Sequence, residues 1–409
     1  MKKTLLFLIS IIILGIEFKA NSQSWWPQTS NTNVNLMNIN YYDDNNGMAF
    51  GDTLSTAIKS SNQGAVWNNL NPSFTTGDIR SSAYLTSSSI IAVGIYDVTG
   101  GNGAVMRSTN NGVTWTSDVT LPEKLFDVSF VNSTEGWISG ENGYIAKTTN
   151  GGINWAQLNS GTGEDIFSLY FISSTEGWAV GTVDAMAVIL HTVNGGTNWT
   201  LQTSNITTPL FSVFFVNSMN GWAVGEGGVI LTTSDGGLNW SAQASGTING
   251  LNDVYFLDAN KGWAVGNGGT VIKTIDGGAT WTSEVSGTTR DINSIEMRHD
   301  SLGWFCGDDG VIHVYSVEPI NSISENSLST QEGLLVYPNP STESVMISLT
   351  IGKGTTDIHV YDGTGKLVKN LITTENSFLM SCEDFKPGVY LIKAISNHGN
   401  IQTAKLVVE

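Results

Sequence analysis

Ser60-Ser61-Asn62-Gln63-Gly64-Ala65-Val66-Trp67 is the first of six copies of one eight-residue box. Every copy has Ser or Thr at its first position, Asn or Asp at its third, Gly at its fifth and Trp at its eighth. Repetition of a unit at intervals of roughly 40–50 residues is typical of propellers and solenoids. The later copies span Ser108 to Trp115, Thr148 to Trp155, Thr192 to Trp199, Thr233 to Trp240 and Thr274 to Trp281.

The box predicts a tight turn in each repeat. Asn and Asp side chains accept hydrogen bonds from nearby backbone N–H groups, and Gly adopts backbone conformations that a Cβ excludes. The Trp that ends each box is predicted to cover apolar surface between neighbouring repeats, with its indole N–H bonded to an acceptor. We therefore assign structural roles to the third residues of the boxes, which are Asn62, Asn110, Asn150, Asn194, Asp235 and Asp276.

A second element, Gly177-Trp178-Ala179-Val180-Gly181, runs in phase with the boxes and has seven full or partial copies. A short apolar segment precedes each copy, as in Val254-Tyr255-Phe256, and few polar residues interrupt either run. Such runs are typical of strands in sheets that are covered on both faces. Four short strands per repeat, separated by Gly-rich turns and repeated seven times, predict an all-β, seven-bladed β-propeller. The other copies begin at Gly47, Ile91, Gly136, Gly221, Gly262 and Gly303.

The seventh repeat lacks a box, and its missing outer strand is predicted at the opposite end of the chain. Trp26-Pro27-Gln28 aligns with the fourth-strand segment Trp155-Ala156-Gln157, and Trp26 precedes Trp67 by 41 residues. We therefore expect the N-terminal strand to complete the last blade, because such a join removes an open sheet edge and closes the ring.

The pairing of Gly-Trp-Ala-Val-Gly with Thr-x-Asp-Gly-Gly-x-x-Trp resembles the Asp-box (BNR-like) propellers. Within that group it is most similar to the repeats of the photosystem II assembly-factor type. The resemblance covers residues 24–317 and implies the propeller fold. It leaves the function open, because one fold hosts many activities.

Both ends of the chain carry predicted targeting segments. Residues 1–22 are interpreted as a signal peptide, since Lys2 and Lys3 precede a short apolar run and Ala20-Asn21-Ser22 offers small residues before a cleavage site. The propeller is assigned to residues 23–318, and the Ser- and Asn-rich stretch 319–332 is assigned as a linker. Residues 333–409 contain several further strand patterns and predict a small seven-stranded β-sandwich.

The C-terminal domain also resembles the sorting domain of the type IX secretion system of Bacteroidetes. The motifs that carry the resemblance are Tyr337-Pro338-Asn339-Pro340, the Asp362-Gly363-Thr364-Gly365-Lys366 turn, Lys386-Pro387-Gly388-Val389-Tyr390 and the Lys405-Leu406-Val407-Val408 end. The resemblance implies export across both membranes by the type IX machinery. It also implies removal of the domain by a surface sortase, followed by release or attachment to surface lipopolysaccharide.

Composition excludes some partners and chemistries. The formal net charge is −18, and with only four Arg residues we expect no nucleic-acid binding. The two Cys residues, Cys306 and Cys382, are interpreted as isolated small hydrophobes in separate domains. No His and Cys cluster has zinc spacing, and Asp43-Asp44-Asn45-Asn46-Gly47 lacks the later Glu of a calcium loop, so we predict neither a metal site nor a cofactor.

The sequence assigns no catalytic residues. A sialidase needs three arginines around its substrate carboxylate, and Arg80, Arg107, Arg290 and Arg298 do not form a plausible inward-facing triad. A glycosidase that uses two carboxylates remains an alternative, with Glu141, Glu226 and Asp308 as candidates, because their convergence cannot be judged without geometry. The five histidines are too scattered to suggest a Ser–His–Asp arrangement.

The favoured hypothesis is an exported or cell-surface propeller that binds a glycan, peptide or protein. In a propeller, the turns between second and third strands share a face with the connections between blades. Residues at the start of these turns are predicted to form an acidic rim round the axial opening, although solubilising turn residues would give the same pattern. The rim residues are Asp52, Glu141, Glu226, Asn267 and Asp308.

Overall fold

The computed structural model describes residues 23–52, 56–70, 77–96, 101–183, 186–316, 334–337, 344–349, 355–362, 366–396 and 401–408. The predicted signal peptide and the predicted linker lie outside these residues. The chain divides into two compact units, residues 1–322 and 323–409, and each is described by itself. Among the described residues, no helix is long and apolar enough to cross a membrane.

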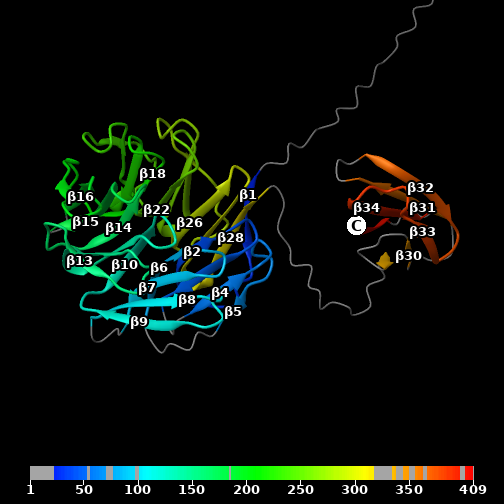
Figure 1. The fold of residues 1–409 in the computed structure, drawn as a ribbon. Coiled ribbons are helices and arrows are strands. Elements are labelled where there is room, and N and C mark those ends of the chain that lie inside the picture. Colours follow the sequence, from blue (N-terminus) through cyan, green and yellow to red (C-terminus); the bar gives the residue numbers. More distant parts are fainter. Residues whose placement is uncertain are drawn as a thin grey trace, which may run out of the picture. The chain divides into compact units, whose positions relative to one another are not determined.

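The first unit is a seven-bladed propeller in which each blade is a four-stranded antiparallel sheet (Figure 1). Blade 1 contains β2 (Leu36–Tyr41), β3 (Gly47–Gly51), β4 (Ala57–Ser60) and β5 (Asn68–Asn69), and blade 2 contains β6 (Ile79–Tyr84), β7 (Ile90–Ile95), β8 (Gly103–Ser108) and β9 (Thr116–Leu121). Blade 3 contains β10 (Leu125–Phe130), β11 (Gly136–Gly140), β12 (Tyr144–Thr148) and β13 (Ala156–Asn159), and blade 4 contains β14 (Ile166–Phe171), β15 (Gly177–Val183), β16 (Met186–Thr192) and β17 (Thr200–Leu201).

The remaining blades repeat this order and the ring then closes on itself. Blade 5 contains β18 (Leu210–Phe215), β19 (Gly221–Gly225), β20 (Ile230–Thr233) and β21 (Ser241–Gln243), and blade 6 contains β22 (Leu251–Phe256), β23 (Gly262–Gly266), β24 (Thr270–Thr274) and β25 (Thr282–Ser283). Blade 7 contains β26 (Ile292–His299), β27 (Leu302–Gly307), β28 (Ile312–Ser316) and, from the other end of the chain, β1 (Ser24–Gln28).

The predicted closure is confirmed. Strand β1 pairs antiparallel with β28, with Trp26 opposite Val314 (Figure 1). The two tryptophans of β1 pack at the two interfaces of blade 7. Trp25 lies in the hydrophobic cluster between blades 6 and 7, and Trp26 packs against the cluster between blades 7 and 1. The Trp25 ring lies 4.7 Å from Phe305, and its indole N–H donates to Glu284 Oε2 at 2.9 Å.

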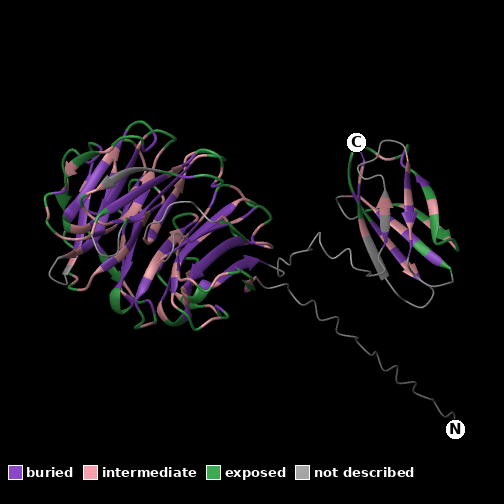
Figure 2. Ribbon diagram, turned by 90° about the horizontal axis from the view of Figure 1, so that it is seen from below, coloured by how far each residue is buried: buried purple, intermediate pink, exposed green. Residues whose placement is uncertain are grey.

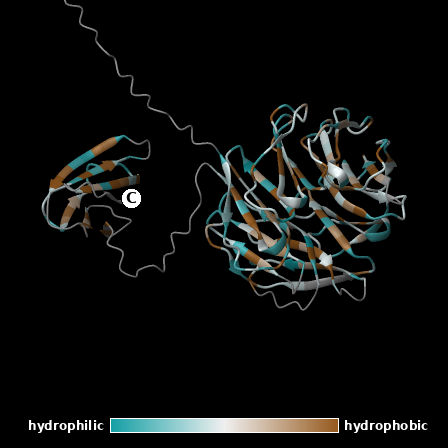
Figure 3. Ribbon diagram, turned by 180° about the vertical axis from the view of Figure 1, so that it is seen from behind, coloured by the Kyte–Doolittle hydropathy of each residue, from teal (hydrophilic) through white to brown (hydrophobic). Residues whose placement is uncertain are grey.

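The core of the propeller lies between the blades. Second strands such as β11 and β19 are buried along their whole length, and the exposed residues gather in the connections (Figure 2). Hydrophobic residues recur along the strands of both units, while many of the loops are hydrophilic (Figure 3). One cluster shows the arrangement, since Trp137 and Ile145 of blade 3 pack against Ile166, Leu169 and Phe171 of blade 4.

Four of the second-strand tryptophans bond to the box of the next blade. Trp137 donates its indole N–H to the Gly195 carbonyl at 3.0 Å, and Trp178 donates to Gly236 in the same way. Trp304 of blade 7 reaches the first box at Gln63. Trp263 is fully buried, and its indole N–H has no partner among the described residues, because blade 7 has no box to supply the carbonyl. The Tyr315 ring packs against Trp263 in its place.

All seven innermost strands carry a β-bulge one residue after their start. In β14, for example, Ile166 pairs with Gly181 and Ser168 pairs with Val180, which leaves Phe167 as an extra residue. The same shift occurs in β2, β6, β10, β18, β22 and β26. A bulge changes the direction of the side chain of its extra residue. In each blade, one residue of the inner strand therefore departs from the regular alternation of side chains between the two faces of the sheet.

The second unit is the predicted seven-stranded sandwich. One sheet has the order β29 (Leu335–Tyr337), β30 (Ser344–Ser348) and β33 (Ser377–Ser381). The other has the order β32 (Leu367–Thr373), β31 (Thr356–Tyr361), β34 (Gly388–Ser396) and β35 (Ile401–Val408). Inward residues of both sheets, such as Val345, Ile358 and Ile392, form one core, and Cys382 lies in it as a free thiol.

Candidate binding site at the mouth of the central channel

The predicted rim residues lie at matching positions on one face of the propeller. Four of them begin short 3-10 turns that directly follow a second strand, and Asp52 directly follows β3. These turns are η1 (Glu141–Gly143), η2 (Glu226–Gly228), η3 (Asn267–Gly269) and η4 (Asp308–Gly310). The second residue of each turn has a positive φ, which Gly, Asn and Asp tolerate best.

Most rim side chains already have a partner in the fold. Lys124 Nζ donates to Glu141 Oε1 at 2.6 Å, and Asn293 Nδ2 donates to Asp308 Oδ1 at 3.0 Å. Asp52 and Asn267 likewise accept from neighbouring Asn side chains. Among the described residues, the Glu226 carboxylate has no hydrogen bond or ion pair, and the residue is exposed. Glu226 is therefore the rim carboxylate that is most available to a ligand.

Other carboxylates on this face hold the blades together. The backbone N–H of Asn142, in η1, donates to Asp165 Oδ1 of blade 4 at 3.0 Å. Gly268 N donates to Asp291 in the same way at 2.7 Å. Asp309 N donates to the amide oxygen of Asn35, so the contact is repeated where the ring closes. These side chains satisfy turn N–H groups, which gives them a structural role.

Inside the rim, the bulge residues of the seven inner strands surround the opening of the central channel. We call this set the mouth ring, and its members are Met37, Arg80, Phe126, Phe167, Phe211, Asn252 and Asn293. Three consecutive members form an aromatic arc, with 5.4 Å between the ring centroids of Phe126 and Phe167 and 5.9 Å between those of Phe167 and Phe211. All three rings are only half-buried, so the arc offers apolar surface at the opening.

A second set, the polar ring, lies one residue further along each strand and lines the same hollow of 120 Å³. Its members are Asn38, Ser81, Asp127, Ser168, Ser212, Asp253 and Ser294. Asp253 accepts from Ser212 Oγ at 2.8 Å and from the Ile295 backbone N–H of the next blade at 2.9 Å. Asp127 makes the equivalent bonds to Ser81 and Leu169. Each carboxylate thus satisfies an edge N–H of the neighbouring inner strand, which the sheet itself leaves unpaired.

Burial perturbs these channel carboxylates. Desolvation raises the pKa of Asp253 to about 6, against the opposing effect of its hydrogen bonds from Ile295, Ser212 and Val254. The pKa of Asp127 is also raised by burial. Perturbed acids in a cavity often mark a functional site, but here the backbone contacts supply a structural reason for their presence.

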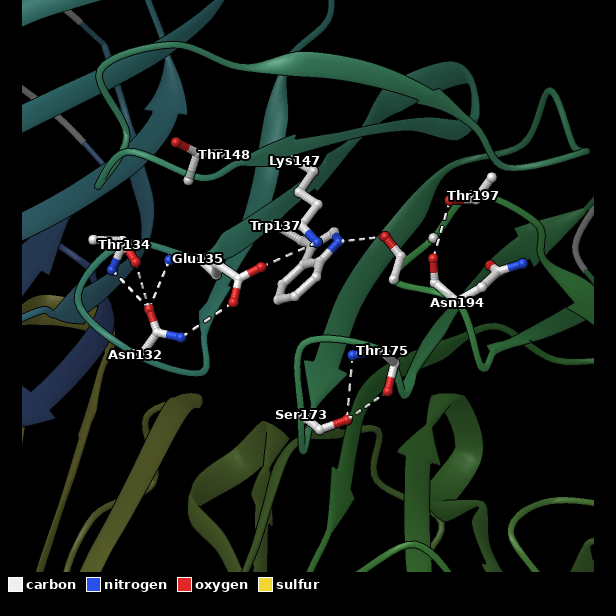
Figure 4. Close-up of polar contacts among 12 residues, drawn as sticks. Asn132, Thr134, Glu135, Trp137, Lys147, Thr148, Ser173, Thr175, Asn194 and Thr197 are labelled. Carbon is white, nitrogen blue, oxygen red and sulfur yellow. Dashed lines mark hydrogen bonds and ion pairs between the residues drawn. The ribbon is translucent and has the colours of Figure 1, made fainter.

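The opposite face is formed by the boxes and the turns between first and second strands, and several of its polar side chains bond to one another (Figure 4). Asn132 accepts from the backbone N–H groups of Thr134 and Glu135. Lys147 lies 4.7 Å from the centre of the Trp137 ring and pairs with Glu135.

The third residues of the six boxes make the same pair of hydrogen bonds. Asn62, Asn110, Asn150, Asn194, Asp235 and Asp276 each accept from the hydroxyl of the first box residue and from a backbone N–H four residues later.

The candidate groups for catalysis are dispersed. Glu141, Glu226 and Asp308 begin turns of blades 3, 5 and 7. Arg80 pairs with Asp78 and Arg298 lies against Asp44, so neither guanidinium is free. Asp43, in the segment that superficially matches a calcium loop, accepts from the backbone N–H groups of its own turn. Within the described part of the chain, no group of three or more His, Cys, Asp or Glu residues could hold a metal ion.

The mouth ring is absent from the predicted site residues, although the sequence contains its signal. Phe stands between an aliphatic residue and Asp or Ser in Leu125-Phe126-Asp127, Ile166-Phe167-Ser168 and Leu210-Phe211-Ser212. A large aromatic residue at the same position in three consecutive repeats marks a shared environment. The sequence does not reveal the bulge, so the alternation of side chains along a regular strand predicts only that this Phe is an ordinary strand residue.

Comparison with known proteins agrees with this architecture. Residues 117–206 and 241–316 match the family of the photosynthesis system II assembly factor YCF48, and residues 335–409 match the secretion system C-terminal sorting domain. The chain joins a YCF48-type propeller to a C-terminal sorting domain. The sorting domain implies interaction with the type IX machinery and secretion or cell-surface targeting.

Solved structures extend the likeness to the complete ring. A structure of YCF48 bound to D1 peptide has a TM-score of 0.60 at 17% identity and covers 74% of this chain and 100% of that chain. YCF48 from Cyanidioschyzon merolae has a TM-score of 0.60 at 19% identity, covering 72% and 98%. The GH74 xyloglucanase from Xanthomonas campestris has a TM-score of 0.59 at 12% identity, covering 80% and 59%. At these identities the likeness shows the fold alone. No curated protein matches the sequence.

Proposed function

We propose that this protein is an exported binding module whose propeller recognises a peptide or protein segment at the mouth ring and the acidic rim. One observation carries the proposal. Seven in-phase bulges turn one side chain per blade toward a single opening, and three consecutive ones are half-buried Phe rings. A partly exposed aromatic arc is the kind of surface that supplies most of the binding energy in protein recognition.

The chemistry round the arc favours a ligand that is apolar at one point and basic beside it. In the part of the chain that the structure describes, the Glu226 carboxylate has no partner and the Asp308 carboxylate accepts only from Asn293, so both add negative potential at the opening. Lys124 offsets part of this potential at Glu141. A peptide ligand is supported further by the structure of YCF48 bound to D1 peptide, since that protein shares the fold.

Changing Glu141 and Glu226 together to Gln is expected to weaken binding of a basic peptide several-fold and to make the affinity less dependent on salt, because screened charge attraction is lost. The single change Glu226→Gln should account for most of the effect, since Lys124 already pairs with Glu141. Isothermal titration at two salt concentrations measures both quantities. Unaltered affinity and salt dependence in the double variant would show that the rim is only a solvated surface.

The alternative function is hydrolysis of extracellular glycans, for which Glu141, Glu226 and Asp308 are the candidate carboxylates. A glycan and peptide array probed with the purified full-length protein, followed by hydrolysis assays on the positive glycans, separates the two. Bound peptides or glycans that stay intact support the binding module. Cleavage of a glycan that is lost in Glu226→Gln supports the enzyme.

We also propose that the protein is processed at both ends, near Gln23 and within residues 319–332, with attachment to surface lipopolysaccharide as one fate of the product. The sorting-domain match supports the second cleavage. Mass spectrometry of the extracellular form is expected to recover propeller peptides and none from Val345 onward. Intact C-terminal peptides in that fraction would contradict processing by a surface sortase.

A further inference from the structure

The central channel contains a second chamber, below the polar ring and toward the face of the boxes. Its walls come from all seven inner strands, and the cavity measures 300 Å³. The side chains two residues beyond the polar ring form its lower ring. The members of the lower ring are Asn40, Ala83, Ser129, Tyr170, Phe214, Tyr255 and Glu296.

The lower ring joins an aromatic wall to a carboxylate. Three consecutive blades contribute Tyr170, Phe214 and Tyr255, with ring centroids 4.7 Å and 4.8 Å apart. Glu296 follows from the next blade, and its Oε2 accepts from the Tyr41 backbone N–H at 2.6 Å. Among the described residues, the other oxygen, Oε1, accepts no hydrogen bond, and Arg298 Nη1 lies 3.9 Å from it.

The charge of this chamber favours a cation once its carboxylates are ionised. Asp127, Asp253 and Glu296 line it, whereas the nearest cationic side chain is Arg298, which also lies 3.7 Å from Asp44. The aromatic wall selects among cations, because hard metal ions require several oxygen ligands to replace their water, and ring carbons supply none. An ammonium group with carbon substituents tolerates aromatic contact and gains from it.

We propose that the lower chamber binds an organic ammonium group, held between the aromatic wall of Tyr170, Phe214 and Tyr255 and Oε1 of Glu296. The site goes beyond the proposed peptide-binding function, which uses the opposite end of the channel. The ammonium replaces the loose Arg298 contact as the close partner of Glu296 Oε1, while Tyr41 N remains bonded to Oε2.

Binding is expected to depend on pH, because the ligand interacts with the ionised carboxylate. Burial raises the pKa of Glu296 to about 8, with Asp253 adding to the rise and Arg298 opposing it. The other titratable groups about it are Tyr41, Tyr84 and Tyr255, all with raised pKa values, and Asp44 beyond Arg298. Affinity should therefore increase between pH 6 and pH 9 as Glu296 loses its proton, and binding should release protons below pH 8.

The test is a titration of the full-length protein with tetramethylammonium chloride, at constant ionic strength against sodium chloride. Saturable binding at pH 8.5 is expected, with at least tenfold weaker binding in Glu296→Gln, which keeps an oxygen for the Tyr41 N–H. Phe214→Leu should weaken binding several-fold while leaving the carboxylate in place. Glu135→Gln, a carboxylate change at a turn outside the channel, is the matched control and should bind as the wild type does.

Three results would overturn the proposal: no saturable binding by the wild type, wild-type affinity in Glu296→Gln, or equal competition by sodium. A melting curve for each variant separates loss of the site from loss of the fold, and Phe214→Leu provides a second reading if Glu296→Gln is unstable. Peptide binding at the acidic rim is measured separately with the Glu226→Gln variant. Failure of the chamber therefore leaves the proposed function standing, and the reverse also holds.

Discussion

Trp25→Ala is expected to lower the melting temperature of the propeller by about 5–15 °C. Trp25 is 5% exposed and packs against Phe305 and Tyr315, so its truncation leaves a cavity that costs roughly 3–5 kcal/mol. The truncated side chain belongs to β1, the strand that closes the ring. The substitution also removes the indole N–H that donates to Glu284. Differential scanning calorimetry of the full-length protein, following the propeller transition, measures the change.

Two companion variants decide whether the effect arises from closure. Deleting residues 23–30 should destabilise the propeller at least as much, because it removes the whole of β1 and exposes the edge of β28. Trp26→Ala should cost less, since the Trp26 ring is half-buried. A melting curve for the deletion variant that matches the wild type would contradict closure by the N-terminal strand.

Glu296→Gln is expected to flatten the pH dependence of stability between about pH 5 and pH 8.5. The folded-state pKa of Glu296 is raised to about 8 from the ordinary value of 4.5, so the folded protein keeps a proton that the unfolded chain releases. Stability from this group is therefore greatest below pH 4.5 and declines as pH rises toward 8. The decline at pH 8.5 should be on the order of 2–4 kcal/mol.

Urea unfolding at pH 5 and pH 8.5 tests this expectation. Wild type should lose stability between the two, and Glu296→Gln should lose much less. Asp253, with a pKa of about 6, contributes in the same direction at lower pH and remains in both proteins. His313, whose pKa burial lowers to about 4, acts below pH 6.5 with the opposite sign. Equal pH slopes for the two proteins would mean that Glu296 is not buried as the lower ring places it.

The fold could be predicted from the sequence because its repeats are marked by residues with few structural alternatives. The boxes need Gly at a positive φ, and the buried second strands need Trp beside small residues, so both patterns recur in register. Trp26 in phase with Trp67 was sufficient to predict closure, because a ring with an open blade leaves an unpaired edge.

The candidate site could be predicted only in part. Glu141, Glu226, Asn267 and Asp308 occupy one register, as expected from their place after each second strand. Their partners could not be predicted, since Lys124 comes from the connection before β10 and Asn293 is the bulge residue of β26. The mouth ring depends on bulges, and the channel acids depend on unpaired edge N–H groups. Neither the bulges nor the unpaired edge N–H groups can be recognised from the sequence of a single repeat.

The central claim is that ligands bind at the mouth ring. Titration of the full-length protein with a peptide selected on the array, comparing wild type with Phe167→Ala and Ile153→Ala, tests it most directly. Phe167 lies at the centre of the aromatic arc, whereas Ile153 is an exposed box residue on the opposite face. At least tenfold weaker binding in Phe167→Ala with unchanged binding in Ile153→Ala is the predicted result. Wild-type affinity in Phe167→Ala, or a loss confined to Ile153→Ala, would contradict the claim.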